Sequence, residues 1–338
     1  MERKHGYGGI DRFRLVAALL IVGIHTFPFT SVSEDLNFFV IHVFARIAVP
    51  FFLMITGYFL LPAYLIEKSC DTKALLSFIK KTGLIYVGAT IVYFPISIYA
   101  GYYSEGNAAA AILRNIVFDG TFYHLWYLPA SIIGVLLLYF LRRVLSFRVL
   151  LVLSLVLYAF GLLGDSYYGA GSSIPFLKSV FEAVFGISSY TRNGLFYAPV
   201  FLIMGTAIAG MEKHMKPIAS IIGFVASVSL MMAEGALLRS FGYQRHDSMY
   251  IMLLPTMFFL FAFLLTRKGS ASGFLRKISM WVYVMHPVCI IAVRGAARLM
   301  GLAALFFVEN SVIHYIAVCA LSLLFSYICV FVISRLRK

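Results

Sequence analysis

Three side chains near the start of the chain have the types and spacing that suit proton transfer and charge binding. Asp11, Arg14 and His25 lie in the stretch DRFRLVAALLIVGIHT, whose other residues are mostly apolar. Because a helix turns by about 100° per residue, Arg14 and His25 differ by about 20° around its axis and lie roughly 16 Å apart along it. Ionisable groups inside a membrane are costly and usually functional. We predict that His25 is a base or a substrate ligand; packing against a neighbouring helix is the alternative.

A second candidate is Arg46, which lies in the apolar run HVFARIAVPFFLMITGYFLL. Counted from the outer end of this run, Arg46 is about 10 Å deep, close to the depth of His25 counted from the other side. An arginine at that depth requires an acidic partner or an anionic ligand. Pro50 frees the carbonyl of Arg46 and kinks the helix. We predict that Arg46 binds a negative group; an ion pair with the deep acid Glu234 is the alternative.

Two aromatic and histidine motifs occur further along the chain. His124 and Trp126 lie in FYHLWYLPA, where aromatic residues are also expected simply because they favour membrane interfaces. Tyr283 and His286 precede Pro287 in WVYVMHPV. A proline that breaks a helix beside a histidine often marks the wall of a cavity. We predict that both motifs contact a substrate.

The motif QRHDSMY stands just before a later apolar run and places Asp247 at its mouth, where a solvated loop would explain the residue equally well. The predicted catalytic residues are therefore Arg14, His25 and Arg46. The predicted substrate-binding residues are Asp11, His124, Trp126, Glu234, Asp247, Tyr283 and His286. The chain shows no serine–histidine–aspartate order, phosphate-binding loop or zinc-ligand spacing, so we expect no metal site.

Composition determines the class of protein. Of the 338 residues, 62% are hydrophobic and only 12% are charged, about half the charge of a soluble protein. Apolar runs of about eighteen residues or more recur along the chain, which predicts an all-α, multi-pass membrane protein. The net charge of +14 lies in short clusters between these runs, which favours contact with lipid head groups and argues against nucleic acid as a partner. The four cysteines have no paired spacing and predict no disulfide framework.

Ten spans are predicted, and the distribution of charge orients them. Twenty Lys and Arg residues fall in the segments on one side and five on the other, so we expect both termini to be cytoplasmic. On that side, 67–81 is a candidate amphipathic surface helix. The first span has no cleavage site and reads as a retained anchor. The predicted spans are 13–30, 39–61, 82–103, 126–141, 149–164, 195–210, 218–239, 249–266, 278–299 and 312–333.

Four ordered motifs give the chain a family resemblance. These are Arg14 followed at the right spacing by His25, the stretch ARIAVPFF from Ala45, the segment HLWYL from His124, and YVMHP ending at Pro287. Together they resemble the membrane-bound acyltransferase-three family over nearly the whole of 1–338, read as a single transmembrane domain. Within that family, GIDRFRL, ARIAVPFF and RHDSMY are most similar to the membrane domain of VanT-type serine racemases of vancomycin-resistant Gram-positive bacteria.

The resemblance implies two competing mechanisms. In the first, the chain binds L-serine in the plasma membrane of a bacterium and imports it for a cytoplasmic racemase domain, with the carboxylate at Arg46. In the second, acyl-CoA approaches Arg14 from inside, and His25 acts as the base for acyl transfer to an acceptor hydroxyl while Arg46 stabilises the oxyanion. A third reading is a passive anchor for the racemase. Nothing in the chain resembles the lysine or phosphate site of a racemase, so we expect no resident cofactor and no racemase domain within it.

Overall fold

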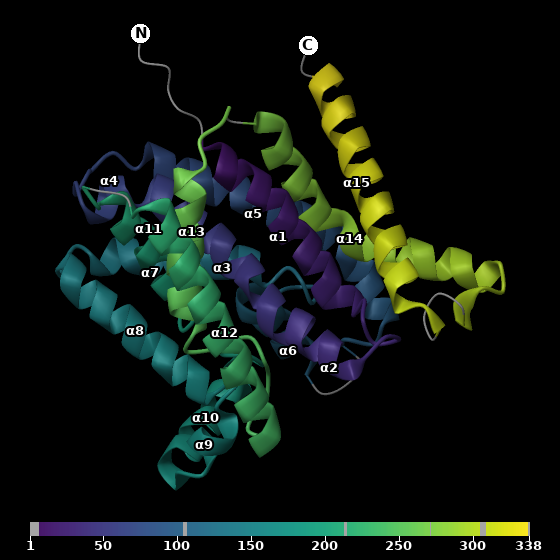
Figure 1. Ribbon diagram of the computed structural model, residues 1–338, viewed down its shortest axis with the longest axis horizontal. Coiled ribbons are helices and arrows are strands. Elements are labelled where there is room, and N and C mark those ends of the chain that lie inside the picture. Colours follow the sequence, from purple (N-terminus) through teal and green to yellow (C-terminus); the bar gives the residue numbers. More distant parts are fainter. Residues whose placement is uncertain (1–6, 104–106, 213–214, 271, 305–308, 337–338) are drawn as a thin grey trace. The chain divides into compact units, whose positions relative to one another are not determined.

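A computed structural model describes residues 7–103, 107–212, 215–270, 272–304 and 309–336 (Figure 1). Within these ranges the secondary structure is helical except for one isolated β-bridge between Tyr7 and Gly269. The chain forms two compact units. Unit 1 comprises the described residues of 1–49, 214–235 and 255–338, and unit 2 comprises those of 50–213 and 236–254.

Unit 1 is built mainly from the first and last helices of the chain. Helices α1 (Gly8–Thr26), α14 (Gly273–Leu299) and α15 (Ser311–Leu336) pack on one another around Ala18, Val22, Val282 and Val318. In Figure 1, α1 is purple and α15 is yellow. The elements that lie wholly or partly in unit 1 are α1 (Gly8–Thr26), α2 (Glu34–Asn37), the π-helical turn η1 (Phe38–Val43), the 3₁₀ turn η2 (Phe44–Ile47), α3 (Ala48–Leu60), α12 (Pro217–Phe241), α13 (Leu253–Thr266), α14 (Gly273–Leu299) and α15 (Ser311–Leu336).

In unit 2, the almost completely buried helix α11 (Ala198–Ala209) packs against α7 (Tyr127–Leu141) and α8 (Phe147–Leu163). Close approach to α3 requires glycine, because a Cβ at Gly205 would overlap the carbonyl of Met54 and one at Gly57 would overlap that of Leu202. The Thr206 hydroxyl donates to the carbonyl of Gly57 at 3.0 Å. The elements wholly in unit 2 are α4 (Pro62–Leu65), α5 (Lys73–Tyr99), α6 (Ala108–Arg114), the π-helical turn η3 (Asn115–Asp119), α7 (Tyr127–Leu141), α8 (Phe147–Leu163), α9 (Tyr168–Ser172), α10 (Pro175–Ile187) and α11 (Ala198–Ala209).

Each of the ten predicted spans coincides with helical structure, which confirms the expected all-helical class for the described residues. Five segments are long and apolar enough to cross a membrane, and the other apolar helices are shorter. The number of ten spans and the cytoplasmic termini stay predictions; residues 1–6 and 337–338 also lie outside the described part of the chain. The five segments are Glu34–Leu60, Lys73–Tyr99, Pro217–Phe241, Gly273–Leu299 and Ser311–Arg335.

Two of the differences from the predicted helix boundaries concern the end of the first helix and the segment 67–81. The first helix ends at Thr26 because Phe27 adopts a left-handed conformation (φ 50°), donates its N–H to Gly23, and is followed by Pro28. His25 therefore lies in the last helical turn, and the helix ends before residue 30, the predicted end of the span. The separate surface helix expected over 67–81 is wrong: residues 67–72 are irregular, and Lys73 begins the long helix α5.

Candidate functional site

The centre of the candidate site in unit 1 is a pair of stacked histidines. His25 comes from the last turn of α1, and His286 comes from α14, which packs along α1. Their ring centroids lie 5.3 Å apart with 20° between the ring planes. His25 is partly exposed whereas His286 is fully buried. Of the two stacked rings, the His25 ring is therefore the accessible one.

Pro287 explains why the His286 ring is fixed. A proline has no N–H, so the carbonyl of Tyr283, four residues earlier, loses its helical donor. Nδ1 of His286 lies 2.8 Å from that carbonyl and 3.2 Å from the carbonyl of Val282. Because both partners are acceptors, Nδ1 carries the proton, and Nε2 of the neutral ring is an acceptor. The phenol of Tyr283 lies beside this ring, 6.5 Å between centroids.

Arg46 is held by an irregular helix that packs against α1. The chain passes from the π-helical turn η1 to the 3₁₀ turn η2, which runs directly into α3 with Pro50 in its first turn, where proline is tolerated. Nε of Arg46 donates to the carbonyl of His42 at 3.4 Å. The His42 ring stacks on Phe27, just beyond the end of α1, with centroids 5.6 Å apart. Both η1 and η2 contact α1, the helix that carries His25.

Asp11 and Arg14 lie at the other end of α1, in an ion-pair network. Oδ1 of the buried Asp11 is 3.5 Å from Nε of Arg14 and 3.2 Å from Nε of Arg276. Oδ2 accepts the backbone N–H of Ser272, the residue that caps α14, at 2.8 Å. The carboxylate therefore joins the starts of α1 and α14, a role that the sequence did not indicate because Ser272 and Arg276 are distant in the chain. Contact of Asp11 or Arg14 with a substrate stays a prediction, as does pairing of the half-buried Glu234 on α12 with Arg46.

Three predicted site residues, His124, Trp126 and Asp247, belong to unit 2. His124 is buried among aromatic rings, with the Tyr93 centroid 5.0 Å away in an edge-on arrangement. Trp126 is nearly buried, and the guanidinium of Arg192 lies 5.2 Å from its ring centroid. Asp247 is half-buried beside His246, whose ring lies tilted against the Tyr190 ring with the centroids 4.4 Å apart. Burial, with the nearby charges of Arg192 and Arg245, lowers the pKa of His246 to about 4.

Sequence reasoning missed Asp165, a fully buried acid in the loop after α8. Its Oδ1 accepts the backbone N–H groups of Ser248 at 2.7 Å and Met249 at 3.0 Å, and the Ser166 hydroxyl at 3.0 Å. Its Oδ2 has no hydrogen-bond partner among the described residues. Burial raises the pKa of Asp165 to about 6. Through these hydrogen bonds the carboxyl group of Asp165 fixes the loop that carries Asp247.

Comparison with known proteins identifies the family. The profile of the acyltransferase-3 family, described as an acyltransferase domain, matches residues 7–331. This chain belongs to the acyltransferase-3 family. The match confirms the resemblance inferred from the four motifs, and it spans both compact units. No solved structure matches the chain.

The acyltransferase-3 domain of this chain is also similar to three racemases. One amino-acid racemase of Enterococcus faecalis is 41% identical over 340 residues, which covers 100% of this chain and 47% of the relative. A second from the same organism is 35% identical over 98% of the chain and 46% of its own length. A serine/alanine racemase of Enterococcus gallinarum is 31% identical over 96% of the chain and 45% of its length. The chain thus spans about half the length of these relatives.

Proposed function

We propose that this chain is a membrane domain that binds L-serine and carries it inward to a cytoplasmic racemase. The observation that carries the proposal is the similarity to racemases along 96–100% of the chain, one of them named for serine and alanine. A racemase acting inside a cell requires its amino acid there, and a polytopic domain is a means of supplying it. We place the protein in the plasma membrane of a bacterium and, through the VanT-type resemblance, in vancomycin resistance.

The geometry of unit 1 offers complementary groups for an amino acid. A guanidinium has five donors in a fork that matches a carboxylate, and Nε of Arg46 donates to the His42 carbonyl. Near the histidine stack, Nε2 of His286 can accept from an ammonium or hydroxyl group, and the Tyr283 phenol can donate or accept. In this proposal Arg46 binds the carboxylate, while His25, Tyr283 and His286 contact the other end of the solute.

Transport by purified protein in proteoliposomes tests the proposal. Radiolabelled L-serine is supplied outside and buffer inside, and accumulation is compared for the wild type, the double variant His25→Ala/Arg46→Ala and the control Arg298→Gln. Arg298 is an exposed arginine of α14 outside the proposed site. We expect uptake in the wild type and control and background counts in the double variant. Background counts in all three would exclude serine transport, and equal uptake above background would exclude the proposed roles of His25 and Arg46.

Replacing Pro287 with alanine tests the orientation of the His286 ring. Alanine restores an N–H that bonds to the Tyr283 carbonyl and so competes with Nδ1 of His286. We expect uptake to fall about tenfold through lost orientation, while the apparent melting temperature stays level or rises. The control is Pro95→Ala, which removes the exposed proline inside α5. An unchanged uptake for Pro287→Ala would mean that the ring orientation does not matter.

Acyl transfer is the second candidate, favoured by the same stack. Two oriented imidazoles suit general-base catalysis in a family described as acyltransferases, and the Asp11–Arg14 pair lies at the other end of the same helix α1. His25 would take the proton of an acceptor hydroxyl, whose oxygen bonds to the acyl carbon of acyl-CoA as the carbon–sulfur bond breaks and the thiol leaves. Thiol release from acetyl-CoA with serine or a sugar, abolished by His25→Ala, would establish this reaction. Absence of both activities would leave the anchoring role.

A further inference from the structure

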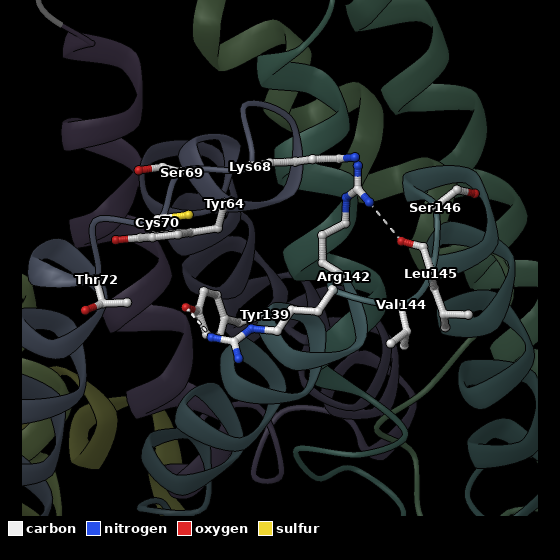
Figure 2. Close-up of a pocket in the computed structure, with 11 residues that line it drawn as sticks. Tyr64, Lys68, Ser69, Cys70, Thr72, Tyr139, Arg142, Val144, Leu145 and Ser146 are labelled. Atoms are coloured by element: carbon white, nitrogen blue, oxygen red, sulfur yellow. Dashed lines mark hydrogen bonds between the residues drawn. The ribbon is translucent and has the colours of Figure 1, made fainter.

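Unit 2 contains a cavity of about 590 Å³ that none of the predicted site residues lines. Its walls come from the irregular segment before α5 and from the turn between α7 and α8 (Figure 2). Three cationic side chains line it, Lys68, Arg142 and Arg143, together with the hydroxyl groups of Tyr64, Ser69 and Thr72. The volume lies within the range typical of small-ligand sites.

The cations are held in place by groups other than acids. Arg142 donates from Nε to the Leu65 carbonyl at 2.7 Å and from Nη1 to the Leu145 carbonyl at 2.8 Å, and these bonds leave its Nη2 edge for a ligand. Arg143 donates to the Tyr139 hydroxyl at 3.0 Å and lies over that ring. In Figure 2 the side chain of Lys68 extends toward the guanidinium group of Arg142.

No acidic side chain lines this cavity or pairs with its three cations within the described residues. Two acids belong to the same irregular segment, but Glu67 is exposed and Asp71 accepts the N–H of Lys73 at 2.9 Å. Two helices also begin at the cavity wall, α5 after Thr72 and α8 after Ser146, and their first turns contain no acid. The positive ends of both helix dipoles therefore add to the three formal charges.

We propose that this cavity binds the phosphate group of an anionic phospholipid. Phosphate oxygens accept from guanidinium and ammonium groups in the manner that Lys68, Arg142 and Arg143 allow. The lining residue Val144 is 81% exposed and the neighbouring Ile66 is 43% exposed, which gives a lipid chain apolar contacts beside the charged cavity. In the orientation predicted from the distribution of charge, both segments lie on the inner side of the membrane, where anionic head groups lie. This inference does not rest on the proposed transport of serine.

Retention of lipid by the purified full chain tests the proposal. The protein is delipidated in detergent and offered phosphatidylglycerol or phosphatidylcholine, and bound lipid is counted by native mass spectrometry. The test variant is Lys68→Gln/Arg143→Gln, which spares the two backbone hydrogen bonds of Arg142. The control is Lys80→Gln/Lys81→Gln, which removes two exposed charges from helix α5 but none from the cavity. We expect retention of phosphatidylglycerol to weaken about thirtyfold in the test variant alone.

Inorganic phosphate distinguishes a lipid from a soluble source of the same group. Cys70 is exposed and lines the cavity, so its rate of alkylation reports occupancy, with Cys70→Ser giving the background from the other cysteines. Protection of Cys70 by phosphate in wild type but not in Lys68→Gln/Arg143→Gln, without selective lipid retention, would support a phosphate site for a soluble ligand and overturn the lipid as its occupant. If neither lipid nor phosphate separates the test variant from the control, the site is refuted.

Discussion

Substituting Asp11 with alanine is expected to destabilise unit 1 by about 3 kcal/mol, the scale of breaking a buried ion pair. Asp11 is only 4% exposed, and its two oxygens contact Arg14, Arg276 and the N–H of Ser272. Alanine leaves the largely buried guanidinium of Arg14 without this carboxylate and removes the link between the starts of α1 and α14. The apparent melting temperature in detergent should fall by roughly 5–10 °C.

Two further variants separate charge from hydrogen bonding at this position. Asp11→Asn keeps an acceptor for the Ser272 N–H but loses the charge, so its melting temperature should lie between those of alanine and wild type. Arg276→Ala removes a partner whose side chain is 48% exposed, and such exposed pairs contribute little. A melting temperature for Asp11→Ala no lower than that for Arg276→Ala would contradict a structural role of the carboxylate.

The second large effect is a dependence of stability on pH that originates at Asp165. The pKa of this carboxyl in the folded protein is about 6, above its ordinary value of 3.8, because the group is completely buried. The folded protein therefore binds this proton more tightly than the unfolded chain. The stabilisation is fully present below about pH 4 and is lost as the pH rises through 6; a shift of two pKa units corresponds to about 3 kcal/mol.

Asp165→Asn isolates this contribution. The amide oxygen can still accept from the N–H groups of Ser248 and Met249, but the group does not titrate. The difference in melting temperature between wild type and Asp165→Asn should shift in favour of the variant between pH 4.5 and 7.5. Asp165→Ala, which loses both acceptors, should be less stable than Asp165→Asn throughout. Parallel curves for wild type and Asp165→Asn over that range would show that the carboxyl does not gain a proton on folding.

The sequence predicts those parts of the fold that depend on local pattern. Apolar runs predicted stretches that are all helical in the structure, and the spacing of Arg14 and His25 correctly placed both residues on one helix. Pro287 indicated an interrupted helical ladder beside His286, and the structure shows the freed carbonyl bonded to that ring. Such features follow from period and from the chemistry of single residues.

Contacts between distant segments could not be predicted in the same way. The stacking of His25 on His286 depends on how α1 packs along α14, which no periodicity specifies. Asp165 resembles an ordinary acid at the end of an apolar helix, and only the approach of Ser248 and Met249 reveals its function in the fold. The contacts of Asp11 with Ser272 and Arg276 could not be predicted for the same reason.

The π-helical turn η1 has a consequence for how this protein tolerates insertions and deletions. A π-helical turn contains one residue more than an α-helical turn. The turn Phe38–Val43 therefore accommodates one extra residue within the helix. Deleting one residue there would restore regular helix but rotate α2 by about 100° relative to Arg46. Homologous chains with an uninterrupted second helix should therefore be one residue shorter between the equivalents of Ser33 and Arg46.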